Sequence, residues 1–322
     1  MIYLEFLEGQ GLGNQLWNYV ALRAITEKLG FNFKIINPHK FKGKEFIDIK
    51  YSSQNNKKSD NLIKNIFYES LFHDKNLKTY SSYFDKEVLK INPNTEIRGL
   101  FQSEKYLFDK DINNYIKLKK NFKKNNNLKK TCLINLRGGE YKRFKNLILP
   151  KKYWLDAIEN IKKISKDITF LIVTDDYDYA SKLLPNIKIL KGNISQDFIN
   201  LFSAEYVILS NSSFAYFPVS LGEKPKIIIA PAHWSRFGNN LERWTSPSNY
   251  YKGWKYQDKS GSFLTNKQIK KSIKSTITYY SSFYIRTLPE FDNKKSLLVI
   301  FPTKLKKIIK KILSKISPMN LG

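Results

Sequence analysis

Residues 131–141 read TCLINLRGGEY, an apolar run that ends at an arginine and two glycines. Such short runs, bounded by turn signals, are typical of strands buried on both faces of a parallel sheet. Similar runs follow at ITFLIVT (168–174), YVILS (206–210) and KIIIA (226–230). With helical patterns between them, they predict a doubly wound α/β domain, in which ligands bind beyond the carboxyl ends of the strands.

Helical patterns fill the intervals between these runs. Pro150 opens one helix, and the apolar residues behind it recur at three- and four-residue spacing: Trp154, Ala157, Ile158, Ile161 and Ile164. YDYASKLL (177–184) and SQDFINLFSA (195–204) predict two shorter helices, the second with Ser195 as its N-cap. IKIL (187–190) predicts one more strand.

The amino-terminal part opens in a similar way. IYLEFL (2–7) predicts a strand, and GQGLGNQ (9–15) a turn into a helix with its C-cap at Gly30. FNFKIIN (31–37) predicts a second strand. Strand, turn, helix and strand in this order are typical of a parallel sheet.

The organisation between and beyond these parts is less regular. Residues from about 40 to 95 give no clear pattern, whereas the Lys- and Asn-rich stretch 110–131 is typical of a linker. We therefore expect domains at 1–128 and 129–285, followed by an extension over 286–322.

The composition restricts the possible functions. With 42% hydrophobic residues among 322, the chain can bury a core, and no stretch approaches the roughly 18 apolar residues of a membrane span. Cys132 is the only cysteine, and MIYLEFLEGQ carries acidic residues where a signal peptide would be basic, so we expect a cytoplasmic protein. The histidines lie far apart, without metal-ligand spacing.

The charge is strongly positive. Lysine and arginine number 56 against 28 acidic residues, a net charge of +28. This favours a polyanionic partner, which could be nucleic acid, an anionic membrane or a phosphorylated substrate. We expect no nucleic-acid binding, because the sequence has no helix-turn-helix, zinc-finger or RNP-like pattern.

Polar sequences follow three of the expected strands. RGGEY (137–141) follows CLINL, TDD (174–176) follows FLIV, and SNSSF (210–214) follows YVIL. Arg137 offers a planar fork for phosphate oxygens, and the two glycines behind it leave room for a pyrophosphate. The alternative is a surface arginine in an ordinary turn. Because carboxyl ends of parallel strands share one edge, these segments predict a nucleotide site.

Three further features leave alternatives open. GQGLGNQ brings backbone amides to a helix N-terminus, but Asn14 stands where the dinucleotide fingerprint has a glycine. Asp176 and Asp178 form a DxD, which either holds Mn or Mg or caps a helix. Asp197 lies 16 residues before Ser213 and either accepts the N–H groups of a guanine edge or is an ordinary first-turn charge.

Together these motifs resemble the family 11 glycosyltransferases, the α-1,2-fucosyltransferases. GLGNQLWNY (11–19) is similar to their GLGNQLFQY, and GLFQSEKYL (99–107) to GYFQSEKYF. INLRGGEY (134–141) stands where they carry HIRRGDY, and ILSNSSFAYFPVSLGEKPKIIIAPAHW (208–234) resembles ISNSSFSWW…KIVIAPKKW. The four blocks occur in the family order.

The resemblance implies an α/β, GT-B-like architecture, with two Rossmann-like domains facing a cleft. It also implies GDP-fucose as donor, inversion at the sugar and no essential metal or other cofactor. From the strand-end motifs and the resemblance together, the expected donor-binding residues are Asn135, Arg137, Gly138, Gly139, Asp175, Asp197, Ser212, Ser213 and Phe214. On the acceptor side of the cleft we expect Gly11, Gly13, Asn14, Gln15 and Tyr141.

Within this set the resemblance implies distinct roles. Arg137 contacts the donor pyrophosphate, Asp197 reads guanine, and the hydroxyls of Ser212 and Ser213 bind phosphate. Arg137 is also the expected catalytic residue that stabilises the leaving diphosphate, with Glu140 beside it as candidate base. The expected acceptor is a hydroxyl of a surface glycan such as O-antigen, lipooligosaccharide or capsule.

The chain departs from the family motifs, and Ala215, Tyr216 and Phe217 stand where the family carries SWW. Asn135 replaces its histidine, Gly138 its second arginine and Glu140 its aspartate. Loss of an arginine weakens neutralisation of the donor charge, which Lys142 or Arg143 would restore, and leaves GDP-colitose or another GDP-deoxysugar as an alternative donor. Two other classes also remain open: a metal-dependent DxD transferase and a non-catalytic basic membrane-binding protein.

The segment TKLKKIIKKILSKI (303–316) has a pattern of its own. Its isoleucines and leucines fall on one helical face, and six lysines occupy the remainder. This predicts a basic amphipathic helix on an anionic membrane surface, which would place the protein on the inner face of the cell membrane. The alternative is a helix docked on the protein itself.

Overall fold

A computed structural model describes residues 1–53, 63–74, 79–143, 147–222, 227–232, 249–280 and 284–285. The α-helices are α1 (Leu12–Leu29), α2 (Lys151–Ile164), α3 (Tyr177–Leu183), α4 (Ile194–Ser203), α5 (Ser213–Leu221) and α6 (Asn266–Tyr280). The strands are β1 (Ile2–Glu5), β2 (Phe33–Ile36), β3 (Ile47–Asp48), β4 (Asn65–Tyr68), β5 (Leu71–Asp74), β6 (Thr79–Ser82), β7 (Thr95–Arg98), β8 (Lys117–Leu118), β9 (Thr131–Leu136), β10 (Thr169–Thr174), β11 (Lys188–Ile189), β12 (Tyr206–Leu209), β13 (Ile227–Pro231), β14 (Lys255–Gln257) and β15 (Tyr284–Ile285).

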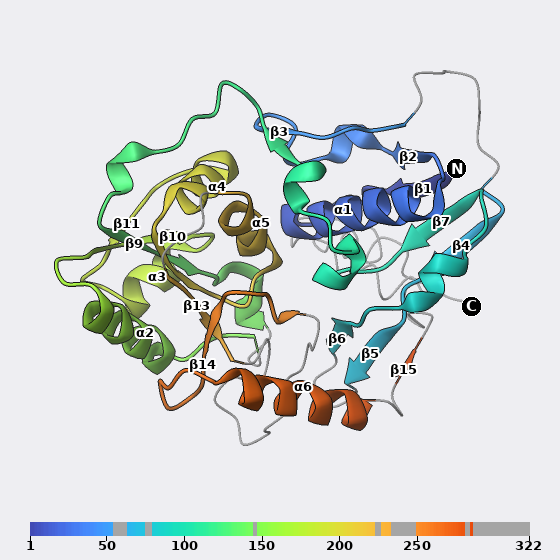
Figure 1. The fold of residues 1–322 in the computed structure, drawn as a ribbon. Helices are drawn as coiled ribbons and strands as arrows, with labels where there is room; N and C mark the ends of the chain where they lie inside the picture. Colours follow the sequence, from blue (N-terminus) through green and yellow to red (C-terminus); the bar gives the residue numbers. More distant parts are fainter. Residues whose placement is uncertain are drawn as a thin grey trace, which may run out of the picture.

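The larger sheet has the order β11-β10-β9-β12-β13-β14, with every neighbouring pair parallel. Counted along the chain this is 3-2-1-4-5-6, the order of doubly wound dinucleotide-binding sheets. On β9, Cys132, Ile134 and Leu136 share a core with α2 and α3. The intervening Leu133 packs with α4 and α5 on the opposite face. Helices therefore cover both faces (Figure 1).

A second parallel sheet, of order β2-β1-β7-β4, is built from the amino-terminal part of the chain. Helix α1 packs on it and ends at Gly30, which adopts the left-handed conformation of a C-cap. Two small antiparallel sheets, β15-β5-β6 and β3-β8, complete the strand pairing. The structure is thus a mixed α/β fold with two parallel sheets.

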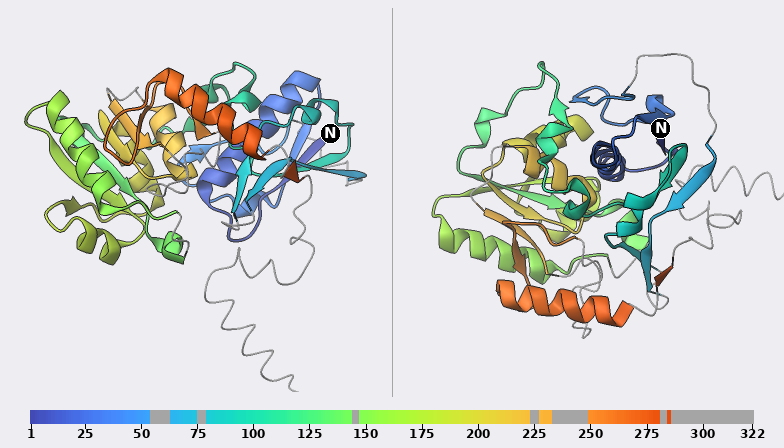
Figure 2. Two further views of the ribbon diagram at one scale, coloured as in Figure 1. Left: turned by 90° about the horizontal axis from the view of Figure 1, so that it is seen from below. Right: turned by 45° about the vertical axis from the view of Figure 1, so that its right-hand side comes forward.

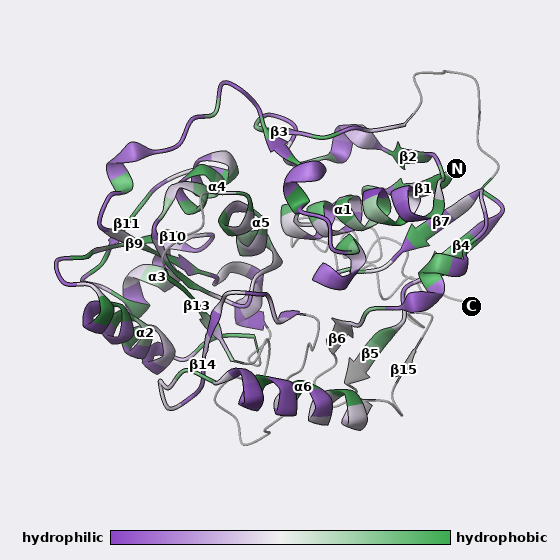
Figure 3. Ribbon diagram, viewed as in Figure 1, coloured by the Kyte–Doolittle hydropathy of each residue, from purple (hydrophilic) through white to green (hydrophobic). Residues whose placement is uncertain are grey.

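Helix α6 runs below both sheets and reaches β5, as the views in Figure 2 show. Purple and green alternate along it in Figure 3 because lysines share the helix with isoleucines. Ile269 is buried, whereas Lys267, Lys270 and Lys271 are exposed. The helix therefore has one face on the protein and one basic face in solvent.

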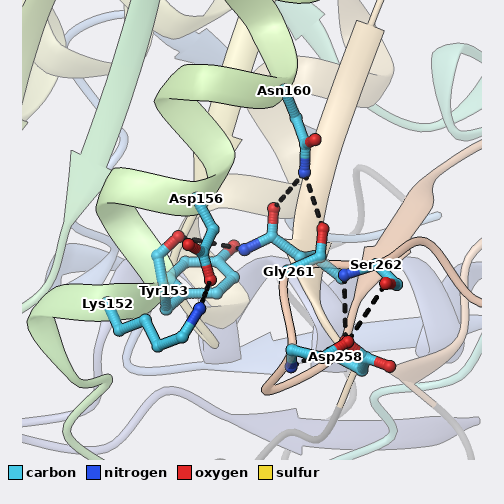
Figure 4. Close-up of polar contacts among 9 residues, drawn as sticks. Lys152, Tyr153, Asp156, Asn160, Asp258, Gly261 and Ser262 are labelled. Atoms are coloured by element: carbon cyan, nitrogen blue, oxygen red, sulfur yellow. Dashed lines mark hydrogen bonds and ion pairs between the residues drawn. The ribbon is translucent and has the colours of Figure 1, made fainter.

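The edge of the larger sheet is attached to α2 through the turn after β14 (Figure 4). Asn160 Nδ2 donates to the carbonyl of Gly261 at 2.8 Å and to Gln257 Oε1 at 3.0 Å. Gln257 Nε2 in turn donates to the Tyr153 carbonyl at 3.0 Å. Asp258 Oδ1 closes the turn by accepting from the backbone N–H of Ser262. These bonds anchor the last strand of the sheet.

The two parallel sheets share an aromatic core between α1 and α5. Trp17 stacks on Tyr216 with ring centroids 4.4 Å apart, and Tyr251 lies 4.4 Å from Tyr216. Trp17, Tyr216 and Tyr251 are all buried. Large aromatic side chains contribute strongly to such contacts, so the first helix of the chain is held firmly against the larger sheet.

Most elements expected from the sequence are present, including the strands at 131–136 and 206–209 and the helix to Gly30. One helix start is corrected. Asn193, not Ser195, is the N-cap of α4, because Asn193 accepts from the N–H groups of Ser195 and Gln196 while Gln196 completes a capping box. The tail helix expected at 303–316 lies outside the described residues. Among those described, no helix is long and apolar enough to cross a membrane.

Candidate active site

The carboxyl ends of β9 and β12 meet where the strand order of the larger sheet reverses. Leu209 pairs with Asn135 at this edge. Ser210 N donates to the Asn135 carbonyl at 3.0 Å, and Ser210 Oγ to Asn135 Oδ1 at 3.2 Å. Tyr141 Oη donates to the Asn211 carbonyl at 3.0 Å. The loops after the two strands are therefore joined at the point where doubly wound sheets bind ligands.

Arg137 directly follows β9, and 30% of its side chain is exposed. Its Nη1 lies 3.0 Å from Asp175 Oδ2, and its Nη2 lies 3.6 Å from Glu140 Oε1. The guanidinium stands 5.5 Å from the centre of the Tyr141 ring. Desolvation raises the pKa of Tyr141 to about 12, so its phenol stays neutral. Arg137 is thus fixed by an ion pair and an aromatic face.

The two glycines after Arg137 allow the backbone to approach a carboxylate closely. Gly138 N donates to Asp175 Oδ1 at 2.9 Å. A Cβ at Gly139 would overlap the Asp175 carboxylate, and one at Gly138 would lie 2.7 Å from the Tyr179 ring. The guanidinium and the Gly138 N–H therefore face the same anionic group.

Asp197 lies in the first turn of α4, half-buried. Its Oδ1 is buried and accepts no hydrogen bond from any residue that the structure describes. Desolvation raises the pKa of Asp197 to about 6, with a further contribution from the charge of Asp175. A desolvated carboxylate without a donor is suited to accept N–H groups from a ligand.

Helices α1 and α5 meet at their first turns. A Cβ at Gly13 would overlap the backbone of Ser213 and Phe214, so only glycine allows this approach. Asn14 Oδ1 accepts from Ser213 Oγ at 2.7 Å and from Gln102 Nε2 at 2.9 Å. Three sequence motifs that are distant along the chain therefore meet at Asn14.

Other expected residues take supporting positions around this junction. Gly11 is the exposed N-cap of α1, and Ser212 is the buried N-cap of α5. The ring of Phe214 packs against that of Phe198, with the ring centroids 6.0 Å apart. Gln15, expected on the acceptor side of the cleft, is fully buried.

Gln15 instead holds a segment that the sequence did not single out. Its Nε2 donates to the Lys40 carbonyl at 2.9 Å, and its Oε1 accepts from Lys42 N at 2.9 Å. Partial desolvation lowers the pKa of Lys42, whose nearby charges are Glu140, Glu8 and Arg137. Gln15 thereby holds the turn after β2 that carries Lys42, whose charge interacts with that of Arg137.

The two aspartates of the DxD motif have different surroundings. Asp176 Oδ1 caps α3 by accepting from Tyr179 N at 3.1 Å, and its Oδ2 is ion-paired with Lys142. Asp178 is exposed in the first turn of α3. Within the described part of the chain, no three His, Cys, Asp or Glu side chains are grouped as a metal site requires.

The model of glycosyl transferase family 11 matches residues 8–258. No curated protein matches the chain.

Some solved structures are distantly similar. NodZ α-1,6-fucosyltransferase soaked with GDP-fucose and fucosyltransferase NodZ from Bradyrhizobium share 14% identity over 68% of this chain, with TM-scores of 0.39 and 0.40. The matches cover 92% and 93% of those chains. POFUT1 in complex with GDP shares 10% identity over 68% of this chain and 94% of its own, with a TM-score of 0.35.

The family match spans most of the chain and includes every candidate residue described above. The protein therefore belongs to glycosyl transferase family 11 and is a glycosyltransferase.

Proposed function

We propose that the protein is an inverting α-1,2-fucosyltransferase that moves fucose from GDP-fucose to a hydroxyl of a surface glycan. The observation that carries this proposal is that Arg137 and Asp197 both lie close to Asp175, and that Asp197 Oδ1 accepts no hydrogen bond from any described residue. An arginine suits the diphosphate, and a carboxylate suits the N1–H and amino group of guanine.

In the proposed reaction the acceptor oxygen attacks the anomeric carbon as the bond to the diphosphate oxygen breaks. The bonding electrons leave with GDP, so negative charge grows on the β-phosphate. Arg137, the Gly138 N–H and the hydroxyls near α5 stabilise that charge, in total by several kcal/mol. Attack opposite the leaving group converts the β-linked donor into an α-linked product.

Glu140 is the proposed base that takes the acceptor proton. Its carboxylate lies 3.6 Å from Arg137 Nη2 and is 66% exposed, so it reaches both the phosphate anchor and solvent.

Asn14 is proposed to face the transferred sugar or the acceptor. Because its Oδ1 accepts two hydrogen bonds, its amide N–H groups point away from both donors. Those N–H groups have no hydrogen-bond partner among the residues described, so they are available to a ligand hydroxyl. This fits a GT-B-like arrangement of domains 1–128 and 129–285 facing one cleft, which is also part of the proposal.

The decisive experiment is GDP release and sugar transfer with a panel of GDP- and UDP-sugars, followed by NMR of the product. We expect GDP-fucose to give an α-1,2 linkage, and GDP-colitose is the main alternative donor. A UDP-sugar as the preferred donor would contradict the proposal. We also propose that no metal is needed, so transfer should survive EDTA; loss on EDTA and recovery with Mn would favour the DxD.

A further inference from the structure

The anion site at Arg137 and Gly138 is filled by a carboxylate of the protein itself. Asp175 Oδ2 is ion-paired with Arg137 Nη1 at 3.0 Å, and its Oδ1 accepts a hydrogen bond from Gly138 N at 2.9 Å. Each oxygen of one anionic group thus faces its own donor. Two oxygens of a bound phosphate would use the same pair of donors.

The turn at Gly138 and Gly139 packs closely against this carboxylate. Gly139 has φ of +23°, and any side chain at this position would collide with the Asp175 carboxylate. The backbone therefore lies against the anionic group with no space left between them. An incoming phosphate cannot reach the Gly138 N–H while Asp175 holds this position.

The local charges also disfavour a second anion. Arg137 is flanked by Asp175 and Glu140, and Asp197 lies close enough to Asp175 for their charges to interact. Arg137 Nε is buried and makes no hydrogen bond to the described residues, so its accessible nitrogens are the two that face carboxylates. A dianionic diphosphate would meet a site that is already neutralised.

We propose that Asp175 is an internal stand-in for a donor phosphate, and that nucleotide binding requires its carboxylate to leave Arg137 and Gly138. The proposal rests on the proposed use of a nucleotide diphosphate sugar. Asp175 would then set donor affinity and, by returning after transfer, promote release of the GDP product. Its side chain is 27% exposed, which gives the carboxylate a route to solvent. The opposing interpretation is that Asp175 permanently supports Arg137.

Titration calorimetry with GDP and with inorganic pyrophosphate distinguishes these interpretations. Asp175→Asn keeps the shape and an oxygen for the Gly138 N–H but removes the charge that competes for Arg137. We expect its Kd for both probes to fall about five- to tenfold. Asp178→Asn removes the same charge from the exposed start of α3 and should leave both Kd values within about twofold of wild type.

Weaker binding of both probes by Asp175→Asn would overturn the proposal and make Asp175 a support for Arg137. Thermal unfolding establishes that the variant is folded, and Asp175→Ser provides a second variant with the charge removed. In transfer assays a stand-in predicts a lower donor KM for Asp175→Asn, whereas loss of a support predicts a higher KM and lower kcat. Wild type that binds pyrophosphate but not GDP would contradict the proposed function, while tighter pyrophosphate binding by the variant would still support the stand-in.

Discussion

The guanidinium of Arg137 makes its polar contacts through Nη1 and Nη2, which are also the nitrogens that a diphosphate would use. Arg137→Ala should lower transfer by about 10²-fold, because one charged donor to the developing negative charge is lost. Arg137→Lys should recover little, since an ammonium cannot reproduce the planar fork. Steady-state kinetics test both variants.

The matched control is Arg98→Lys. Arg98 pairs through two nitrogens with Glu96 in the smaller parallel sheet, outside the site. We expect this variant to transfer normally. Near-normal rates for Arg137→Ala would show that the anchor of the diphosphate lies elsewhere.

The carboxyl of Asp197 gives the donor affinity a pH dependence. Its pKa is raised to about 6, and only the ionised form accepts both guanine N–H groups. Donor binding should therefore weaken about tenfold between pH 7 and pH 5. Fluorescence or calorimetric titration with GDP-fucose measures this, because its diphosphate does not titrate near pH 6.

The raised pKa of Asp197 also makes the free energy of unfolding depend on pH. The folded-state pKa of Asp197 exceeds its unfolded value, so its contribution to stability is fully present below about pH 4. That contribution is lost as the pH rises through 6. Asp197→Asn should bind GDP-fucose weakly at every pH and remove this part of the stability profile. If the affinity of Asp197→Asn for GDP-fucose depended on pH as that of wild type does, Asp197 would be excluded from guanine recognition.

The sequence alone identified some residues of the candidate site but missed others. Arg137 was identified because it directly follows a buried strand. Asp197 was identified because it lies in the first turn of an expected helix. Lys42 was not, because its place depends on the Gln15 carboxamide, 27 residues earlier in the chain. No local pattern records such a contact. The choice of Asn193 over Ser195 as helix cap likewise depends on the reciprocal bond from Gln196.

Between elements, the contact of α1 with α5 depends on one glycine. Gly13→Ala would place a Cβ inside the backbone of Ser213 and Phe214, so the two helices would have to separate. We expect a loss of about 1–3 kcal/mol in unfolding free energy, measured by denaturant melts. Donor affinity should also fall, because Ser213 would lose Asn14.

Gly11→Ala is the control for this change. Gly11 has φ of −68°, and nothing lies within 4 Å of an added Cβ. This variant should be as stable as wild type. Equal losses from both substitutions would show that flexibility of the turn, and not close packing, explains the glycines.

The elements of the larger sheet were predictable because strands buried on both faces appear as continuous apolar runs. β9 begins and ends where the sequence indicates, at residues 131 and 136. The segment from 40 to 95 was not predictable. Strand β4 is short and lies partly exposed, and it pairs with β7 about thirty residues later, which no local periodicity encodes.

At the scale of the whole molecule, the net charge of +28 exceeds what one nucleotide site needs. We propose that the surplus, above all in residues 303–316, attracts the protein to the anionic inner face of the cell membrane. Truncation after Phe301 should release the protein from anionic vesicles but preserve transfer to a soluble acceptor, because each lysine adds about 1 kcal/mol near such a surface. Vesicle flotation at low and high salt measures this. Binding that neither truncation nor salt reduces would favour a docked helix.

We propose that the carboxyl edge of the larger sheet, at Arg137 and Asp197, recognises a guanosine diphosphate sugar. Thermal unfolding in the presence of GDP or UDP tests it most directly, because only a ligand of the folded state raises the melting temperature. At a hundredfold excess over Kd, GDP should add about 2.7 kcal/mol of stability, and UDP at the same concentration should add little, since Asp197 would find no guanine edge. Equal stabilisation by UDP, or none by GDP, would contradict the account.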